Sequence, residues 1–322
     1  MSLGLPIDRP LTIAVIGDVH DLWQPADARA LKHLGVDLAL FVGDFGNEAV
    51  PIVAEIASLN LPFAAAFGNH DAWYTATPWG RQQCPYDRQQ EDWVQQQLDL
   101  MAEAHIGYRN RDFLELNLSV VGGRPFSWGG PEWKYAEFYQ QRFGVSSFAE
   151  STAQIVAAGQ QTASDTVIVL SHNGPTGLGD RPEDPCGRDW QPLGGDYGDP
   201  DLEAAIANIK DLGKQIPLVT FGHMHHRLRH TRSRLRTAIK QIGSTVYLNA
   251  ASVPRILSTP DGDCRNFLLV ALKAAVVTEV AIVWLNPDLE LASRQILYSC
   301  HDGQTADVLT SQELADRAEC KS

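Results

Sequence analysis

Five short polar motifs recur along the chain, and each contains Asp, Asn or His, the side chains that bind metal ions or move protons. In order, they are Gly17-Asp18-Val19-His20, Gly43-Asp44, Gly68-Asn69-His70-Asp71, Ser171-His172-Asn173 and Gly222-His223-Met224-His225. Alternate residues of an extended segment lie on one side, so the Asp-x-His and His-x-His pairs each present two ligands together. The four residues of these two pairs, together with Asp44, Asn69 and His172, make seven potential ligands. This is more than one metal ion binds. The motifs therefore predict two metal ions that share a bridging carboxylate.

Such a pair of ions has a defined chemistry. Ions held about 3.5–4 Å apart can clamp the attacking and leaving oxygens of an in-line displacement and lower the pKa of a bridging water, which makes a hydroxide near neutral pH. Oxygen and nitrogen ligands without thiolate favour Mn²⁺, with Fe or Zn²⁺ as alternatives. None of the five cysteines lies in a motif. A single Gly-Asp is a common turn and a lone His is usually structural, as we expect for His33, His105 and His301, so the hypothesis depends on the complete set.

The segments between the first motifs alternate between strand and helix. Apolar runs predict strands over 11–16, 37–42 and 61–67, and apolar faces predict helices over 25–34 and 47–59, the second capped by Asn47. This order indicates a parallel sheet with right-handed crossovers, in which sites form outside the carboxyl ends of the strands. Asp18, Asp44 and Asn69 fall there. Later strands are predicted over 114–122, 166–170, 218–221 and 245–249, and helices over 88–104 and 202–212.

Composition limits the classes of partner. The 322 residues are 44% hydrophobic, enough for a sizeable core, and carry a formal net charge of −13. This charge disfavours nucleic acid and anionic membrane as partners. Scattered cysteines and an N-terminus without a signal-peptide pattern favour the cytoplasm. The apolar stretch 267–285 is predicted to be a hairpin of two buried strands rather than a membrane span, because Lys273 and Glu279 lie within it.

Two segments leave alternatives open. The aromatic-rich segment 125–142 is either packing under a long loop or a lid over the site, and the two interpretations weigh equally. The run 226–236 holds five Arg; a solvated surface strand balanced by acidic residues is favoured over a rim that attracts phosphate. The tail 300–322 is polar and is either a surface helix or partly disordered.

The order of the five motifs resembles the calcineurin-like metallophosphoesterases. The resemblance covers the sheet from residue 11 to about residue 285, with the segments 72–112, 124–165 and 176–200 outside it as candidate cap or lid insertions. It implies an α/β fold in which two mixed sheets pack as a sandwich flanked by helices, within a single domain over 1–322.

The resemblance also implies a role for each site residue. Asp18, His20 and His225 would bind the first metal, Asn69, His172 and His223 the second, and Asp44 would bridge them. His70 would stabilise the phosphoryl transition state or protonate the leaving oxygen, with Asp71 orienting it. Asn47 and Arg255 are candidate substrate contacts. Arg255 follows the turn 249–252, which resembles a turn of the family, and its planar fork suits phosphate oxygens.

Differences from other branches of this family narrow the range of expected substrates. No Arg follows Gly43-Asp44, Asp71 stands where the protein phosphatases have Glu, and Asn47 stands where purple acid phosphatases have a Tyr ligand. The chain is more similar to the branch that acts on small molecules and phosphodiesters, including a subgroup of cyanobacteria and chloroplasts, and 171–177 resembles a turn of cyclic-nucleotide phosphodiesterases. We expect a phosphodiesterase for a small molecule, with direct attack by hydroxide. The alternatives are a phosphomonoesterase for a small metabolite and a non-catalytic metal-binding scaffold. The oligomeric state is not predicted.

Overall fold

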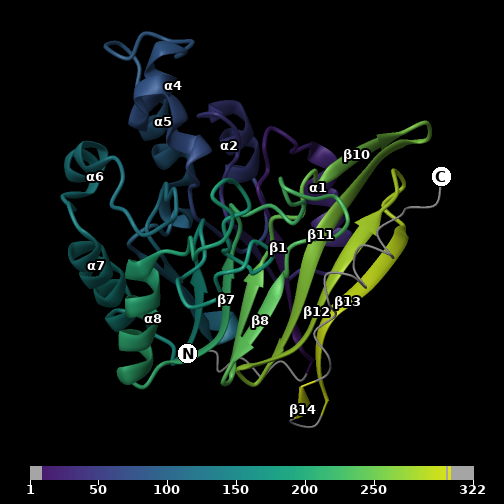
Figure 1. The fold of residues 1–322 in the computed structure, drawn as a ribbon. Coiled ribbons are helices and arrows are strands. Elements are labelled where there is room, and N and C mark those ends of the chain that lie inside the picture. The colour runs from purple at the N-terminus through teal and green to yellow at the C-terminus, as the bar shows by residue number, and fades with distance from the viewer. Residues whose placement is uncertain (1–8, 302–303, 306–322) are drawn as a thin grey trace.

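The computed structural model describes residues 9–301 together with residues 304 and 305, with side chains as far as residue 300 (Figure 1). The expectations for the side chain of His301 and for most of the tail 300–322 lie outside this described part.

The first sheet has eight strands in the order β14-β13-β12-β11-β1-β2-β3, with β10 paired to β11. Its strands are β1 (Leu11–Ile16), β2 (Leu38–Phe41), β3 (Phe63–Ala65), β10 (Ile256–Thr259), β11 (Gly262–Lys273), β12 (Val276–Leu285), β13 (Leu291–His301) and β14 (Gln304–Thr305). β1, β2 and β3 run parallel, whereas β11 is antiparallel to β1 and to β12. The sheet is therefore mixed, and the apolar stretch 267–285 forms the predicted hairpin.

The second sheet has six strands in the order β4-β5-β6-β7-β9-β8. Its strands are β4 (Asn110–Phe113), β5 (Leu118–Gly122), β6 (Thr166–Leu170), β7 (Gln215–Phe221), β8 (Ile239–Ile242) and β9 (Thr245–Asn249). The four central strands run parallel, and the antiparallel strands β4 and β8 form the two edges.

Alternation along β1 shows how the layers pack. Ile13 and Val15 belong to the cluster between the two sheets, whereas Ala14 and Ile16 belong to the cluster on the other face of the first sheet. All four are buried. A strand covered on both faces favours an apolar residue at every position, which explains the apolar run from Ile13 to Ile16 in β1.

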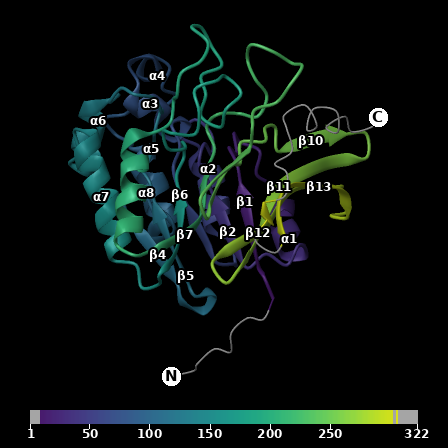
Figure 2. The ribbon, with the colours of Figure 1, turned by 60° about the horizontal axis from the view of Figure 1, so that its bottom comes forward.

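Helices cover the two outer faces. Leu31 of α1 (Pro25–His33) and Val53 of α2 (Val50–Ala57) pack on the first sheet. Ile155 of α7 (Phe148–Gln160) and Ile206 of α8 (Pro200–Asp211) pack on the second. Figure 2 shows α7 and α8 as a layer outside β6 and β7. The predicted sandwich of two mixed sheets flanked by helices is confirmed.

Several helices differ from the prediction, including α5, expected over 88–104 but found at Trp93–Met101, and two others bear on the site and the layers. The helix expected over 47–59 begins only at Val50, so Asn47 is not its cap. Helix α7 was not predicted, although Ser147 caps it by accepting a hydrogen bond from the Glu150 backbone at 3.3 Å. The Ser-x-x-Glu pattern over 147–150 is a helix-start signal that the sequence contained. Because α7 packs on the second sheet, this part of the segment 124–165 belongs to the outer layer of the sandwich.

The segment after β3 rises at the end of the molecule toward which β1 runs (Figure 1). It contains a 3₁₀ turn (His70–Ala72) and the helices α3 (Trp73–Ala76), α4 (Pro78–Gln82) and α5 (Trp93–Met101). Two further 3₁₀ turns at Ala102–Ala104 and Leu114–Leu116 follow, and α6 (Ala136–Phe143) lies after β5. Within the described part of the chain, no helix combines the length and the apolar character that a membrane span requires.

Candidate metal centre

All seven predicted ligands lie just beyond the carboxyl ends of parallel strands. Asp18 follows β1, Asp44 follows β2 and Asn69 follows β3. His172 follows β6, and His223 and His225 follow β7. Since β1–β3 belong to one sheet and β6–β7 to the other, the ligands meet where the two sheets face each other.

The first group of ligand atoms comes from Asp18, His20 and His225, and all lie within 4.8 Å of one another. Nε2 of His225 is 3.2 Å from Oδ2 of Asp18 and 3.1 Å from Nε2 of His20. This is the set predicted to bind the first metal.

The second group comes from Asp44, His172 and His223, again within 4.8 Å. Asn69 joins it, because its Oδ1 lies 3.0 Å from Nε2 of His172. Oδ1 of Asp44 is 3.3 Å from Nε2 of His172, and Oδ2 of the same carboxylate is 3.9 Å from Nε2 of His20. The two oxygens of Asp44 thus face the two groups, which is the arrangement that a bridging carboxylate requires.

His172 provides a test of whether a cation fits. Its Nδ1 lies 2.8 Å from the carbonyl oxygen of Val42, so Nδ1 carries the proton and Nε2 presents a lone pair. That lone pair faces Oδ1 of Asn69 and Oδ1 of Asp44, which are also acceptors. Three acceptors that converge without a hydrogen between them repel one another unless a cation lies among them. The residues present therefore fit a metal ion.

The glycines of the motifs make room for this convergence. A Cβ atom on Gly68 would lie 2.2 Å from Oδ1 of Asp44 and 2.5 Å from Cε1 of His172. A Cβ atom on Gly222 would lie 2.1 Å from Oδ1 of Asp18. Any side chain at either position would displace a ligand, so the glycine in each motif is a packing requirement.

The ligands also carry backbone strain. His20, Asp44 and His223 have φ values of 43°, 51° and 66°, in the left-handed region that side chains other than glycine rarely adopt. Such residues each cost on the order of 1–3 kcal/mol and occur mainly at functional sites.

Electrostatics favour the metal-binding protonation states of His223 and Asp18, whereas the pKa of His225 is raised, because burial, which lowers it, is outweighed by the hydrogen bond and charge of Asp18. Burial lowers the pKa of His223 to about 3, so its imidazole is neutral. Burial opposes ionisation of Asp18, but the hydrogen bond and charge of His225 outweigh it and lower the pKa of the carboxyl. Deprotonated carboxylates and neutral imidazoles are the forms that bind metal ions.

The partner of His70 differs from the prediction. Nδ1 of His70 lies 2.6 Å from Oδ1 of Asn47, whereas the carboxylate of Asp71 accepts backbone N–H groups from Asp44, Phe45 and Gly68 at 2.7–3.0 Å. The expectation that Asp71 orients His70 is therefore wrong. Asp71 is fully buried and holds two ligand loops together, while the exposed Asn47 orients the imidazole. A contact between Asn47 and substrate stays a prediction.

His70 itself lies beside the metal ligands. One of its nitrogens is within 4.8 Å of ligand atoms of His20 and Asp44, and its backbone N–H donates to Oδ1 of Asp44 at 2.9 Å. One face of its ring stacks on Trp73, with ring centroids 5.0 Å apart and planes at 11°. The motifs did not single out Trp73, although a Trp three residues after His70 on a helical turn lies on the same face.

Arg255 is not placed as a substrate contact. It is 2% exposed, and its guanidinium donates to the Leu22 carbonyl at 2.6 Å and to Oδ1 of Asp27 at 2.8 Å. It also lies over the rings of Trp23 and Phe267. The Arg255 side chain thus forms a buried ion pair with Asp27 of α1. This corrects the expectation that it contacts substrate.

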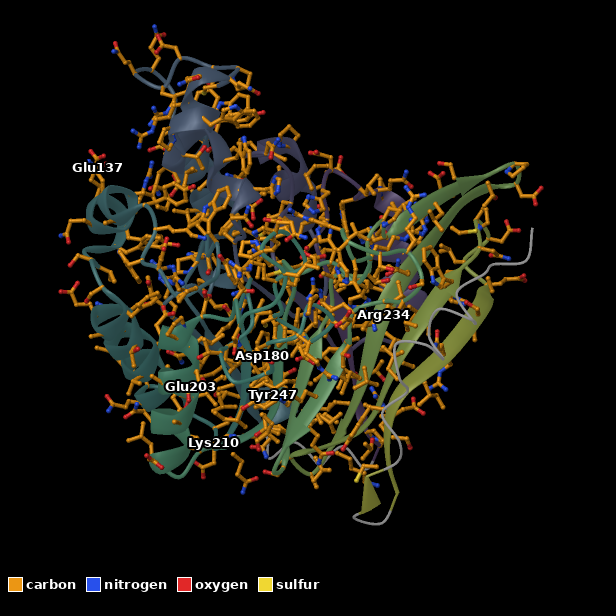
Figure 3. All side chains as sticks on the ribbon, viewed as in Figure 1. Glu137, Asp180, Glu203, Lys210, Arg234 and Tyr247 are labelled. Atoms are coloured by element: carbon orange, nitrogen blue, oxygen red, sulfur yellow. The ribbon has the colours of Figure 1, made fainter. Side chains whose placement is uncertain are left out.

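Acidic residues balance the basic run 226–236, as the favoured interpretation of a surface strand predicted. Arg236 differs from that interpretation, because it is not solvated. Arg234, labelled in Figure 3, pairs with Glu183 at 2.7 Å. Arg236 is 1% exposed, pairs with Asp189 at 3.3 Å and donates to the carbonyl oxygen of His225 at 3.0 Å. It therefore fixes the backbone of a metal ligand, a role that a charge pattern cannot reveal.

Two further features lie near the candidate metal centre. Asn249, at the start of the turn 249–252, donates to the carbonyl oxygen of Met224 at 2.8 Å and so holds the His-x-His turn. In the segment 125–142, Trp128 stacks on Trp73, whereas Trp133 packs on Tyr139 and lies under Arg124. One end of this segment thus reaches toward His70, and the rest is packing.

The comparison with protein families agrees with this geometry. A model of the family described as calcineurin-like phosphoesterase matches residues 11–227, which is more than half of the chain. The chain belongs to the calcineurin-like phosphoesterase family and is a metal-dependent phosphoesterase. The family uses a pair of divalent ions, and the two ligand groups are candidate sites for them. No curated protein matches the chain.

Solved structures give weaker similarities. The protein TT1561 of Thermus thermophilus has 11% sequence identity and a TM-score of 0.48, covering 83% of this chain and 97% of that one. A dimetal phosphatase from Danio rerio has 14% identity and a TM-score of 0.42, covering 85% and 96%. An archaeal phosphodiesterase has 11% identity and a TM-score of 0.31, covering 89% and 100%. With TM-scores below 0.5, these similarities carry no argument about substrate.

Replacing Asn47 tests its role toward His70. We expect Asn47→Ala to lower kcat about 10- to 100-fold, because the imidazole loses the acceptor that orients it. Metal content should stay unchanged, and Asn47→Asp, which keeps an acceptor, should restore most of the rate. Steady-state kinetics with metal analysis check this. Wild-type kcat in Asn47→Ala would show that another contact orients His70.

Replacing Arg255 separates a structural role from substrate binding. Arg255→Ala should lower the free energy of unfolding by about 3 kcal/mol, because it removes one partner of a buried ion pair. The kcat/KM of the folded enzyme should change little. Denaturant unfolding measures the first quantity, and Arg9→Ala, which breaks an exposed ion pair with Asp37, is the control. Normal stability of Arg255→Ala with a large rise in KM would instead support the expected contact between Arg255 and substrate.

Proposed function

We propose that this enzyme is a binuclear phosphodiesterase that acts on a small-molecule phosphate ester. The observation that carries the proposal is the position of Asp44, whose two carboxylate oxygens face the two ligand groups beside His70. A site of this kind can hold both the attacking and the leaving oxygen of an in-line displacement at phosphorus.

A bound metal pair would supply Lewis acidity that activates water for direct attack on phosphorus and neutralises charge on the phosphoryl oxygens. Asp18, His20 and His225 would hold one ion, Asn69, His172 and His223 would hold the other, and Asp44 would contribute to both. Mn²⁺ is the proposed metal, with Fe or Zn²⁺ as alternatives, since the donors are oxygen and imidazole nitrogen without thiolate.

His70 handles the proton of the leaving group. Oδ1 of Asn47 can only accept, so Nδ1 of His70 carries a proton toward it and Nε2 is the nitrogen left for substrate. In the protonated imidazole, Nε2–H donates its proton to the oxygen that leaves phosphorus. Trp73 on the ring face and Asn47 at Nδ1 fix the direction of that donor.

Charge around the centre supports a diester. A phosphodiester carries one negative charge and a monoester up to two, so a monoesterase gains more from free cations at the site. Here Arg234 and Arg236 are paired with Glu183 and Asp189, and Arg255 is buried in its own ion pair. The less charged ester therefore fits better, and a monoester of a small metabolite is the alternative that the experiment below tests.

The proposed setting is the cytoplasm. Cys84, Cys186, Cys264 and Cys300 are all free thiols in the described part of the chain, as a reducing compartment favours. The net charge of −13 argues against nucleic acid as substrate.

Metal content tests the binuclear site. We expect close to two transition-metal ions per chain by elemental analysis of enzyme loaded with Mn²⁺. Asp44→Asn should reduce the content and lower kcat/KM by more than about 100-fold, because the bridging charge is lost. Arg255→Ala serves as a control with an intact ligand set. One ion per chain, or a fully active Asp44→Asn variant, would refute the bridged pair.

Substrate preference tests the reaction. With Mn²⁺, kcat/KM for bis(p-nitrophenyl) phosphate should exceed that for p-nitrophenyl phosphate, because the ion pairs of Arg234, Arg236 and Arg255 keep these three cations from a second negative charge on the ester. His70→Ala should lower the rate with both esters while metal stays bound. The opposite preference would identify a monoesterase, and hydrolysis of neither ester by metal-loaded protein would support the scaffold.

A further inference from the structure

Three tryptophans form one wall beside His70. Trp73 begins α3, Trp79 lies in α4, and Trp128 follows β5, so the wall joins two segments that are distant in the sequence. The ring of Trp73 lies 5.2 Å from that of Trp128 at 28°, and 5.5 Å from that of Trp79 at 86°. We call these three residues the aromatic wall.

The outermost member of the wall is open to solvent. Trp79 is 54% exposed, so about half of the surface of this large apolar side chain contacts water. Trp73 is covered by His70 and Trp128, so it supports the wall, whereas the ring of Trp79 still has area free for a ligand. An exposed aromatic ring next to a catalytic centre is a typical ligand contact.

The wall is contiguous with the metal centre through His70. The His70 ring contacts His20 on the metal side, nearly perpendicular at 86°, and stacks on Trp73. In the proposed reaction, the leaving oxygen takes its proton from His70. The group bonded to that oxygen therefore leaves from a point that Trp73 connects to the rest of the aromatic wall.

We propose that the aromatic wall binds a planar aromatic ring in the leaving group, with Trp79 as the residue that determines specificity. This inference rests on the proposed phosphoesterase function and adds the substrate class, a phosphate ester of a nucleoside or of an aryl alcohol. The wall residues carry no charge, so they contact the ring and leave phosphate to the metals. Stacking on tryptophan is favourable for every planar base and needs no base-specific hydrogen bonds.

Matched ligands isolate the contribution of the ring. Adenosine 5′-monophosphate and ribose 5-phosphate share phosphate and sugar and differ only in the base. Dissociation constants for the Mn²⁺-loaded enzyme, measured by calorimetry, should favour the nucleotide by about 5- to 100-fold, the range of one aromatic stack. Phenyl phosphate is included to distinguish a simple aryl ring from a nucleobase.

Variants assign the preference to the wall. Trp79→Ala should remove most of the difference between nucleotide and ribose phosphate, and Trp79→Phe should retain part of it. Leu114→Ala is the control, because Leu114 is 70% exposed on a different segment. Thermal unfolding should be unchanged in all three variants, since both positions are exposed.

The outcomes separate this inference from the proposed function. Equal affinity for the nucleotide and ribose 5-phosphate, or an equal loss of affinity for both in Trp79→Ala, would contradict ring binding by the aromatic wall. Hydrolysis of bis(p-nitrophenyl) phosphate would still support the proposed phosphodiesterase. Base-dependent binding without hydrolysis of any ester would retain the wall and overturn the proposed reaction.

Discussion

The structure depends on the convergence of seven lone-pair donors in one place. Two buried carboxylates, one amide and four imidazoles face each other at the junction of the sheets, and the proton of His172 is directed away, to Val42. Such a cluster repels itself and loses solvation, a cost that bound cations would offset. The fold holds this arrangement with left-handed backbone at His20, Asp44 and His223 and with glycines where ligands would collide.

The sandwich provides the rigidity that this convergence requires. Each sheet contributes ligands from the ends of neighbouring parallel strands, and a strand buried on both faces cannot shift its register without exposing apolar residues. Three buried side chains then fix the loops. Asp71 binds the N–H groups around the second and third motifs, Asn249 binds the Met224 carbonyl, and Arg236 binds the His225 carbonyl. They act on the backbone, so the ligand side chains remain free to bind metal.

The aromatic wall beside His70 comes from segments other than the strands of the two sheets. The segments after β3 and β5 do not extend the sheets toward the centre; instead they supply Trp73, Trp79 and Trp128 next to His70. Across the centre, the loops 176–200 and 226–236 are joined by ion pairs such as Arg236 with Asp189. Trp79 and Trp128, which we propose to contact a leaving group, lie in segments outside the five motifs, and such segments can vary without changing the metal centre.

The sequence by itself placed the candidate ligands together, and its resemblance to a known family implied the sandwich. Asp18, Asp44, Asn69, His172, His223 and His225 were expected at one site because each closely follows an apolar strand, and parallel strands bring their carboxyl ends to one edge. Only the tertiary structure decided the partners of the other residues. His70 is oriented by Asn47 rather than by its neighbour Asp71, Arg255 pairs with Asp27, and Arg236 is buried within a run that reads as solvated. The physical reason is that strand periodicity is a local property, whereas a hydrogen bond between side chains depends on the path of loops that join distant segments.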